Sequence, residues 1–394
     1  MIALNMASAA PDVSGSFVSA GFNLIGKTDG SMGFTVATDI TGTIAVPRDP
    51  MLDPAGLQNN GGPTPTIALL LGSPAIDKGT SAGLTGNLTT DQRGSGFPRI
   101  FDNPQVSSAA GGDSADIGAY ELQVAPGLVA NVSTRLAVGK DDDALFEGFI
   151  IQGPAGSAKK IMVRALGPFL TQFGVTDALA NPTLEIRDAN TTKVASNNDW
   201  RNTEVGGLIT GDQSAEINSS GLAPSNDLES AIIANLAPGS YTAVVRGLGN
   251  TTGTGLVDAF DLSASSLARV VNFATRGLVQ PGEKLLTAGF IIQDGPVRAV
   301  IRAIGPSLTG PPFNITNALP DTTLQLRDQN GNLVQENDDW ETDQKQELLD
   351  TGLQPSNAKE AALVRTIQPG QYTVQVRGKP ETTGIGVVEI YFLQ

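Results

Sequence analysis

Asn131-Val-Ser-Thr-Arg135 and Asn272-Phe-Ala-Thr-Arg276 begin two parts of the chain that share the same motifs in the same order. Residues 131–262, called copy 1, and residues 272–393, called copy 2, therefore carry one folding unit twice. Tandem copies of a domain are common in spacers, adhesive surfaces and polymers, and they are unusual in enzymes. Further matching stretches are Gly148-Phe-Ile-Ile-Gln152 with Gly289-Phe-Ile-Ile-Gln293, Arg164-Ala-Leu-Gly-Pro168 with Arg302-Ala-Ile-Gly-Pro306, and Pro238-Gly-Ser-Tyr241 with Pro369-Gly-Gln-Tyr372.

Each copy has the residue pattern of many short strands. Tyr, Ala or Val, and Val alternate with other residues in Tyr241-Thr-Ala-Val-Val-Arg-Gly247 and Tyr372-Thr-Val-Gln-Val-Arg-Gly378, which is the period of a half-buried strand. Both stretches follow a Pro-Gly turn signal. In copy 2, Asn330-Gly331 is the strongest short hairpin signal. About eight strands in about 130 residues predict an antiparallel sandwich of the jelly-roll kind. The only helical pattern, at 226–233 and 357–364, is equally compatible with a strand that has a capped entry.

The composition excludes several classes of protein. The 394 residues carry a formal net charge of −15 without a basic stripe, so nucleic acid is not expected as a partner. The chain has no Cys and no His, which excludes disulfides, zinc sites of the usual kind and nucleophiles activated by His. No run of about 18 apolar residues is present, so no membrane span is expected. An acidic surface keeps an exposed protein soluble and attracts cations.

Residues 1–123 have a different pattern. Short apolar pieces such as Phe22-Asn-Leu-Ile25 and Gly42-Thr-Ile-Ala-Val46 alternate with Gly, Asn and Asp, which is typical of a parallel β-solenoid. We therefore expect an all-β protein in three parts. These parts are a short parallel β-helix end at 1–123, a jelly-roll-like antiparallel β-sandwich at 124–265 and a second such sandwich at 266–394.

Five motifs follow one another in the N-terminal part, and together they carry a resemblance to a known family. They are Leu52-Asp-Pro54, Asn59-Asn-Gly-Gly-Pro-Thr-Pro-Thr66, Gly72-Ser-Pro-Ala-Ile-Asp77, Asp91-Gln-Arg-Gly94 and Asp116-Ile-Gly-Ala-Tyr-Glu121. This string resembles the choice-of-anchor Q segment, which closes right-handed parallel β-helices in large bacterial surface and secreted proteins. The resemblance covers residues 20–123. Ile67 stands where that family usually has His, which argues for a structural position.

The repeated unit is similar to β-sandwich repeats at the C-terminal ends of such surface proteins. It also resembles bacterial pre-peptidase C-terminal domains through Leu184-Glu-Ile-Arg-Asp188, Asn198-Asp199-Trp200 and Pro238-Gly-Ser-Tyr241, taken in that order. Members of these groups act as stalks, targeting modules or binding modules, and some bind calcium. The resemblance therefore implies a non-catalytic role.

Acidic and amide residues precede the only two tryptophans of the chain, Trp200 and Trp340. Carboxylate and amide oxygens are the ligands that Ca²⁺ prefers, so one hypothesis is a calcium site in each copy. A second interpretation is a turn whose Trp fills the end of the sandwich core, and a third is a Trp on which sugars stack. The candidate calcium ligands are Asp188, Asn198 and Asp199 in copy 1 and Asp328, Asp338 and Asp339 in copy 2.

Arg164 and Arg302 lie within apolar stretches that we expect to be strands. A buried Arg must be paired, so we expect the same ion pair in both copies, with carboxylate or phosphate binding as the functional alternative. The candidate partners are Asp188 and Asp328, or Glu229 and Glu360.

Charged residues in the N-terminal motifs offer a second candidate site. Some β-helix enzymes use clustered carboxylates, and these residues could form a hydrolase site. Structural pairing is the favoured interpretation, with Arg93 bound to Asp116 or Asp77. The residues concerned are Asp77, Asp91, Arg93, Asp116 and Glu121.

These observations favour a non-catalytic extracellular structural or cell-surface protein that acts as a stalk or as a self-assembling, filament-forming subunit. An open β-helix end exposes a strand edge, so we expect either covalent continuation in a larger surface protein or head-to-tail strand addition by a second copy. One alternative is a calcium-dependent adhesin or glycan-binding module. A second alternative is a fragment of a β-helix polysaccharide lyase or hydrolase.

Overall fold

The computed structural model describes residues 1–83, 88–103, 106–123, 127–263, 266–282 and 284–393. Two compact units are present, Met1–Pro126 and Gly127–Leu393. The larger unit contains both copies of the repeat. Among the residues described, no helix is long and apolar enough to cross a membrane.

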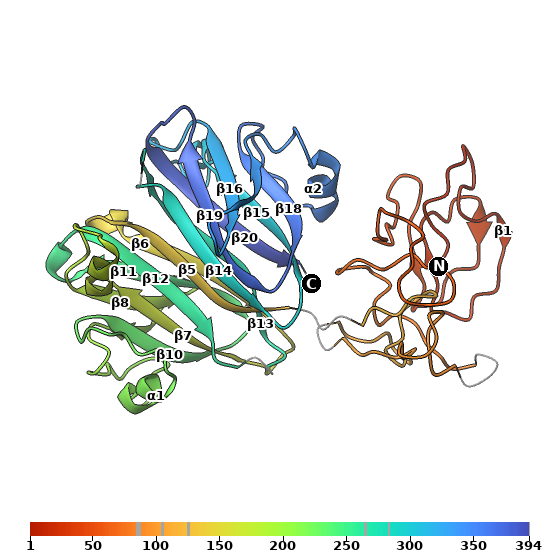
Figure 1. Cartoon of the computed structure of the whole chain (residues 1–394), viewed down its shortest axis with the longest axis horizontal. Coiled ribbons are helices and arrows are strands. Elements are labelled where there is room, and N and C mark those ends of the chain that lie inside the picture. The colour runs from red at the N-terminus through yellow and green to blue at the C-terminus, as the bar shows by residue number, and fades with distance from the viewer. Residues whose placement is uncertain (84–87, 104–105, 124–126, 264–265, 283, 394) are drawn as a thin grey trace. The chain divides into compact units, whose positions relative to one another are not determined.

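The larger unit consists of two eight-stranded antiparallel sheets (Figure 1), which confirms the expected all-β, antiparallel sandwich architecture. The strands of copy 1 are β5 (Leu128–Val138), β6 (Leu145–Gln152), β7 (Lys159–Leu166), β8 (Pro182–Asp188), β9 (Lys193–Asn197), β10 (Ser230–Leu236), β11 (Gly239–Gly247) and β12 (Gly253–Asp261). The strands of copy 2 are β13 (Arg269–Val279), β14 (Leu286–Gln293), β15 (Val297–Ile304), β16 (Thr322–Asp328), β17 (Leu333–Asn337), β18 (Ala361–Ile367), β19 (Gly370–Gly378) and β20 (Gly384–Leu393).

Both sheets are shared between the two copies. Sheet 1 has the order β10-β7-β12-β5-β14-β19-β16-β17, and sheet 2 has the order β18-β15-β20-β13-β6-β11-β8-β9. In sheet 1, β5 of copy 1 is hydrogen-bonded to β14 of copy 2, and the two lie side by side in Figure 1. In sheet 2, β6 of copy 1 is likewise paired with β13 of copy 2. The boundary between 265 and 266 therefore divides the sequence repeat, while the packing unit contains both copies.

One hydrophobic core lies between the two sheets and contains residues of both copies. Alternate residues of the strands point into it, as the regular alternation of buried and half-buried residues along β20 shows. At the junction of the copies, the hydroxyl oxygens of Thr134 and Thr275 lie 2.7 Å apart and share a hydrogen bond. These two residues hold the same position in the two copies, so their contact marks an approximate twofold relation between the copies.

The structure contains the predicted hairpin turn, and it places the short helices outside the stretches that had a helical pattern. The stretches at 226–233 and 357–364 lead into strands β10 and β18, so the strand alternative is the one observed. Short helices occur instead at α1 (Ser214–Ser219) and α2 (Lys345–Thr351), which the sequence pattern did not indicate. The Asn330-Gly331 turn joins β16 to β17, with Gly331 at a φ of +78°, as predicted for a hairpin turn.

The tryptophans do not fill the end of the sandwich core. Trp200 packs with Met162, Ile217 and Ile233, and Trp340 forms the corresponding cluster in copy 2. Ile217 belongs to α1, so each Trp joins a short helix to its sheet in a separate small core. Trp200 is 2% exposed and Trp340 is 6% exposed, which leaves no free ring face on which a sugar could stack.

The N-terminal unit contains two short parallel strand pairs. They are formed by β1 (Gly15–Ser16) with β3 (Ser31–Met32) and by β2 (Leu24–Ile25) with β4 (Ile40–Thr41). Gly15 is opposite Ser31 and Leu24 is opposite Ile40, so both pairs join residues 16 positions apart. Beyond an isolated parallel bridge between Ile2 and Ile25, the described part of this unit has no further parallel pairing. A continuous parallel β-helix is therefore not observed.

Candidate cation sites and buried ion pairs

In copy 2, three carboxylates converge beside the hairpin formed by β16 and β17. Asp321 immediately precedes β16, while Asp338 and Asp339 immediately follow β17. Because the two strands are antiparallel, the start of one lies beside the end of the other, as the pairing of Leu324 with Asn337 shows. One carboxylate oxygen from each of the three residues lies within 4.8 Å of the others. Such an arrangement can hold a metal ion with oxygen ligands.

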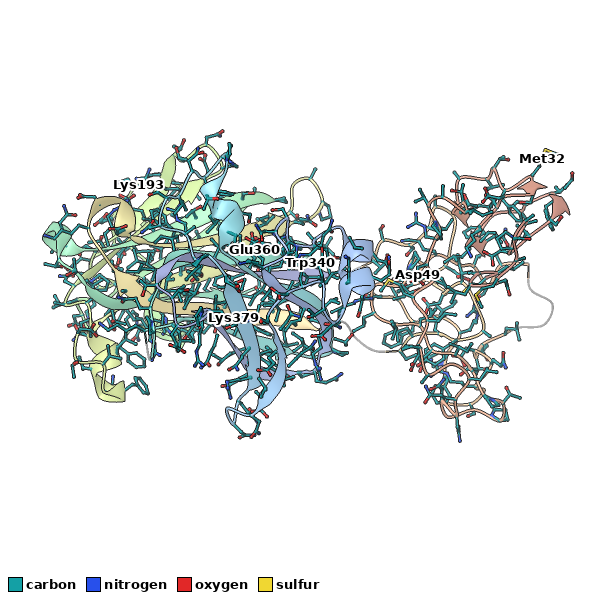
Figure 2. All side chains as sticks on the ribbon, turned by 90° about the horizontal axis from the view of Figure 1, so that it is seen from above. Met32, Asp49, Lys193, Trp340, Glu360 and Lys379 are labelled. Carbon is teal, nitrogen blue, oxygen red and sulfur yellow. The ribbon has the colours of Figure 1, made fainter. Side chains whose placement is uncertain are left out.

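The electrostatics of this cluster reflect three negative groups held close together. Burial raises the pKa of Asp321, and the neighbouring charge of Asp338 raises it further. Lys379, which is labelled in Figure 2, forms an ion pair with Asp338, and this hydrogen bond raises the pKa of Lys379. Lys379 and Lys359, whose charges both lower the pKa of Asp321, offset only part of the charge of three carboxylates, so the cluster retains an attraction for a cation.

Several oxygens of the cluster are buried and accept no hydrogen bond from the described residues. In copy 2 they are Oδ1 of Asp321 and Oδ1 of Asp338. The corresponding positions of copy 1 repeat the feature, with Oδ1 of Asn181, Asn198 and Asp199 in the same condition. A buried acceptor without a donor costs about 1–3 kcal/mol. A hard cation satisfies such oxygens directly, and here they recur at the same positions in both copies.

The two copies differ in charge at these positions. Asn181 and Asn198 of copy 1 occupy the places of Asp321 and Asp338, so copy 1 offers one carboxylate where copy 2 offers three. Leu248 occupies the place of Lys379. Calcium affinity rises with the number of charged ligands, so the site in copy 2 is the stronger candidate.

Asp188 and Asp328, which the sequence suggested as further ligands, do not join these clusters. Asp328 Oδ1 accepts hydrogen bonds of 2.9 Å from the backbone N–H groups of Asn330 and Asn332, within the hairpin turn. Asp188 holds the matching turn of copy 1. Asp328 is seven residues from Asp321 along one strand, which at about 3.3 Å per residue places it roughly 20 Å away. The expected set of six ligands is therefore divided between two ends of the hairpin.

Sequence reasoning also missed Asn181 and Asp321. Both lie just before a strand whose hairpin partner ends at the Asn-Asp-Trp motif. The pairing of β8 with β9 and of β16 with β17 brings them into place. The sequence contained a signal for them, because the predicted hairpin turn implies two paired antiparallel strands. The start of the first strand then lies beside the end of the second, where the Asn-Asp-Trp motif follows.

The two arginines in apolar strands are paired, but with partners that the sequence analysis did not suggest. Arg164 binds Asp258 of the neighbouring strand with N–O distances of 2.9 and 2.6 Å. Arg302 binds Glu389 in the same way, with its Nε 2.9 Å from the carboxylate. The cross-strand register determines both pairs, since Asp258 is directly opposite Arg164.

The carboxylates proposed earlier as partners serve the backbone instead. Glu229 Oε1 accepts hydrogen bonds from the N–H groups of Gly167 and Phe169. Glu360 Oε1 accepts the corresponding bonds from Gly305 and Ser307 in copy 2. Both residues therefore fix the turn that follows the Arg-containing strand.

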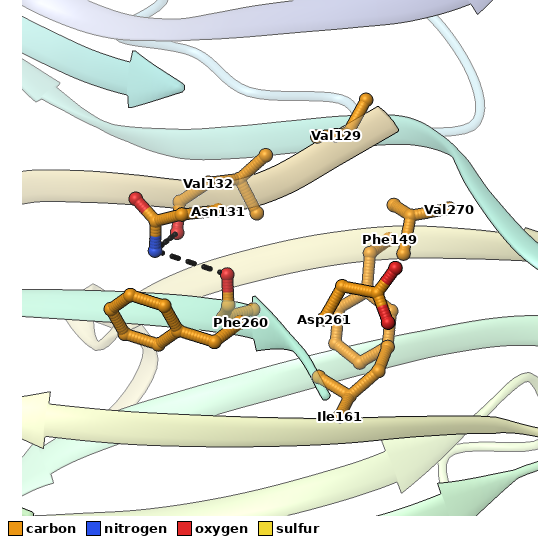
Figure 3. A pocket seen from close by; sticks show the side chains of 9 residues that line it. Val129, Asn131, Val132, Phe149, Ile161, Phe260, Asp261 and Val270 are labelled. Carbon is orange, nitrogen blue, oxygen red and sulfur yellow. Dashed lines mark hydrogen bonds between the residues drawn. The ribbon is translucent and has the colours of Figure 1, made fainter. Parts of the chain in front are cut away.

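A buried ion pair is present in copy 1 but absent from the matching positions of copy 2. Lys159 Nζ lies 2.6 Å from Asp261 Oδ2, and their side chains are 2% and 6% exposed. Lys159 also donates to the carbonyl oxygen of Ser263 at 3.0 Å. Figure 3 shows Asp261 beside Phe149 and Ile161. Copy 2 has Val297 and Phe392 at these two positions.

Charged residues of the N-terminal motifs form a buried network. Arg93 binds Asp91 at 2.7 Å and lies between the rings of Phe97 and Tyr120, at 4.0 and 3.9 Å. Arg99 binds Glu121 at 3.2 Å. We expected Arg93 to pair with Asp116 or Asp77. This prediction was wrong, because Arg93 pairs with Asp91, which is two residues away in the sequence.

The other carboxylates of this network accept hydrogen bonds from the backbone. Asp116 accepts from the N–H groups of Asp77 and Leu122, and Glu121 accepts from those of Phe101 and Asp116. Burial raises the pKa of Asp77 to about 7, that of Asp116 to about 6 and that of Glu121 to about 8. These raised pKa values follow from burial within a hydrogen-bonded framework.

Comparisons with known proteins add little to this description. No family model matches the chain, and no curated protein matches it. Among solved structures, a DUF4785 family protein from Legionella pneumophila is similar with 10% identity and a TM-score of 0.20. The alignment covers 67% of this chain and 63% of that one, which is less than two thirds of its length. A TM-score this low supports no argument about fold or function.

Proposed function

We propose that this chain is a non-catalytic structural module of an extracellular surface protein. The proposal rests on the contacts made by the polar residues that both copies share. Arg164 and Arg302 join neighbouring strands, while Glu229 and Glu360 fix turns. Residues retained in both copies thus maintain a framework, which is what a stalk or an assembly subunit requires.

The N-terminal unit supports a role in end-to-end assembly. Its two parallel strand pairs share one offset of 16 residues, as successive rungs of a solenoid do. Large apolar side chains are exposed at these strand pairs: Val18, two residues after β1, is 101% exposed, and Met32 of β3, labelled in Figure 2, is 70% exposed. An exposed apolar rung with a strand edge accepts another strand by backbone pairing. The occupant that we propose is a second copy of this chain or a further rung of a longer surface protein.

Mass measurement across a dilution series tests the assembly proposal. We expect the purified protein to form oligomers that dissociate on dilution, and Val18→Lys to shift the equilibrium to the monomer because a charge blocks strand addition. Leu57→Lys is the matched control, since Leu57 is 70% exposed in the same unit but lies 16 residues after the last paired strand, β4, whereas Val18 lies two residues after β1. A wild-type protein that is monomeric at every concentration contradicts self-association.

A second candidate function is calcium binding at the clusters of the two copies. The recurrence of unpartnered buried oxygens at matching positions carries this candidate. Calorimetric titration with CaCl₂ tests it: we expect Asp339→Asn to weaken binding and Asp328→Asn, at the other end of the hairpin, to leave it unchanged. The absence of any heat of binding in the wild-type protein refutes calcium binding, and equal losses in both variants refute the assignment to this cluster.

A polysaccharide lyase or hydrolase is less well supported. Asp77 is 0% exposed and Asp116 is 1% exposed, and both are occupied by backbone hydrogen bonds. Catalysis requires such groups to contact the substrate. Turnover of acidic or neutral polysaccharides that is lost in Asp77→Asn would overturn the non-catalytic proposal.

A further inference from the structure

A groove on the outer face of sheet 2 crosses the junction of the two copies. Strand β6 of copy 1 supplies Phe146 and strand β13 of copy 2 supplies Arg276. Strands β11, β15 and β20, together with the loops after β15 and before β18, form the rest. Its volume is about 520 Å³, within the range of about 300–1,000 Å³ that is usual for small-ligand sites. The groove is separate from the cation clusters, whose residues do not line it.

The groove contains a positive charge without a counter-ion. The Arg276 guanidinium lies 4.8 Å from the centre of the Phe146 ring, and within the described part of the chain it has no carboxylate partner. Arg302, which also lines the groove, is neutralised by Glu389. The field that a ligand meets here is therefore set by Arg276, although the whole chain is acidic. A guanidinium beside an aromatic ring suits a planar carboxylate.

Two further features of the groove select the rest of the ligand. Gln354 Oε1 is buried and accepts no hydrogen bond from the described residues, so it can accept one from a ligand hydroxyl. Phe313 is 57% exposed and lines the same groove beside Leu308. Its ring offers an apolar surface of the kind that packs against the C–H face of a sugar.

Copy 1 lacks this combination at the matching positions. Phe169 stands in place of Ser307, Ala223 in place of Gln354 and Thr287 in place of Phe146. Arg135 is retained in place of Arg276. Three of the side chains that line the groove therefore differ at the matching positions of the other face, while the arginine is kept.

We propose that this groove binds an acidic oligosaccharide through a uronate residue. The carboxylate pairs with Arg276, a ring hydroxyl donates to Gln354, and the apolar face of the sugar packs against Phe313. A uronate carries all three features on one ring, whereas an acidic peptide side chain lacks the hydroxyl and the apolar ring face. The proposal is independent of calcium binding and of self-assembly.

Calorimetric titration of the full chain with trigalacturonate tests the proposal. A chelator is present, so that the cation clusters do not contribute. We expect saturable binding that weakens as salt is added, and little binding of the neutral galactose trisaccharide. Arg276→Ala should weaken binding about tenfold or more, because it removes a charge-assisted pair. Arg135→Ala, at the matching position of copy 1, should leave the affinity unchanged.

Two substitutions that copy 1 already tolerates complete the test. Ser307→Phe should fill the groove and abolish binding, and Gln354→Ala should weaken it. Gln354→Ala also keeps the test decisive if the larger Phe perturbs folding, which circular dichroism reports. The proposal is overturned by the absence of trigalacturonate binding, by equal binding of the neutral trisaccharide, by binding that none of these variants changes, or by preferential binding of triglutamate.

Discussion

The buried pair of Lys159 and Asp261 offers a sharp test, because copy 2 contains its apolar replacement. Transferring Val297 and Phe392 gives the double variant Lys159→Val with Asp261→Phe. Breaking a buried ion pair by removing one partner costs about 3–5 kcal/mol, since a charge is left uncompensated. Replacing both partners by well-packed apolar residues is neutral or stabilising by about 1–4 kcal/mol.

The surroundings of the pair make the two single variants unequal. The charge of Asp261 also acts on Arg269, whose pKa is lowered by burial and raised by this carboxylate. Removing Asp261 therefore takes its negative charge away from both Lys159 and Arg269. Removing Lys159 leaves Asp261 close to the positive charge of Arg269. We expect Asp261→Phe alone to lie near the upper end of the range, about 5 kcal/mol, and Lys159→Val alone near the lower end, about 3 kcal/mol.

The double variant should recover most of this loss. In copy 2, the ring of Phe392 packs edge-on against Phe290, with centroids 6.1 Å apart. Phe149 is the counterpart of Phe290, and Figure 3 shows it beside Asp261, so the same contact is available in copy 1. We expect the double variant to unfold with a free energy within about 1 kcal/mol of the wild type, or higher.

Urea unfolding of the four proteins, followed by Trp fluorescence, measures these differences as a double-mutant cycle. With the losses expected for the single and double variants, the coupling energy between the two positions is about 7 kcal/mol or more. A double variant whose loss equals the sum of the two single losses would refute the reasoning. So would a Lys159→Val variant as stable as the wild type.

Three further predictions follow from buried groups. Glu147 is fully buried, neither of its carboxylate oxygens has a partner among the described residues, and burial raises its pKa well above the usual value. Glu147→Met should therefore raise the free energy of unfolding in urea by about 1–3 kcal/mol. A destabilised variant would contradict this. Burial raises the pKa of Glu121 to about 8, so the folded N-terminal unit binds this proton more tightly than the unfolded chain does. Its stability should therefore fall as the pH rises from about 4.5 to 8, which hydrogen exchange of peptides covering 90–122 can follow; protection that rises over this interval would be the opposite result. Saturating CaCl₂ should raise the melting temperature of the wild type more than that of Asp321→Asn, and equal shifts would remove Asp321 from the ligand set.

Much of the local structure was predictable from residue patterns, but the sharing of the sheets was not. The strands at 241–247 and 372–378 and the Asn330-Gly331 hairpin follow from alternation and turn chemistry. The pairing of β5 with β14 has no such signature, because the same apolar alternation suits a partner strand from either copy. Val132 and Phe290 are opposite one another across that junction, and nothing in their types distinguishes this partner from another.

The candidate cation sites were predictable to the same extent. Asp338 and Asp339 were recognised because they are adjacent in sequence to Trp340. Asp321 was missed because only the pairing of two strands brings it close. Asp328 lies in the turn and not in the carboxylate cluster, and the sequence alone does not distinguish these two places, because the hydrogen-bond donors of the turn become known only from the structure.

The contact between Thr134 and Thr275 has a further consequence. A twofold relation between two copies that share both sheets is the geometry of a homodimer whose subunits have been joined into one chain. A single copy alone would leave the edges of β5 and β6 open, and a second identical copy would close them. Joining the copies replaces a bimolecular encounter with a local one, so that folding of this unit no longer depends on protein concentration.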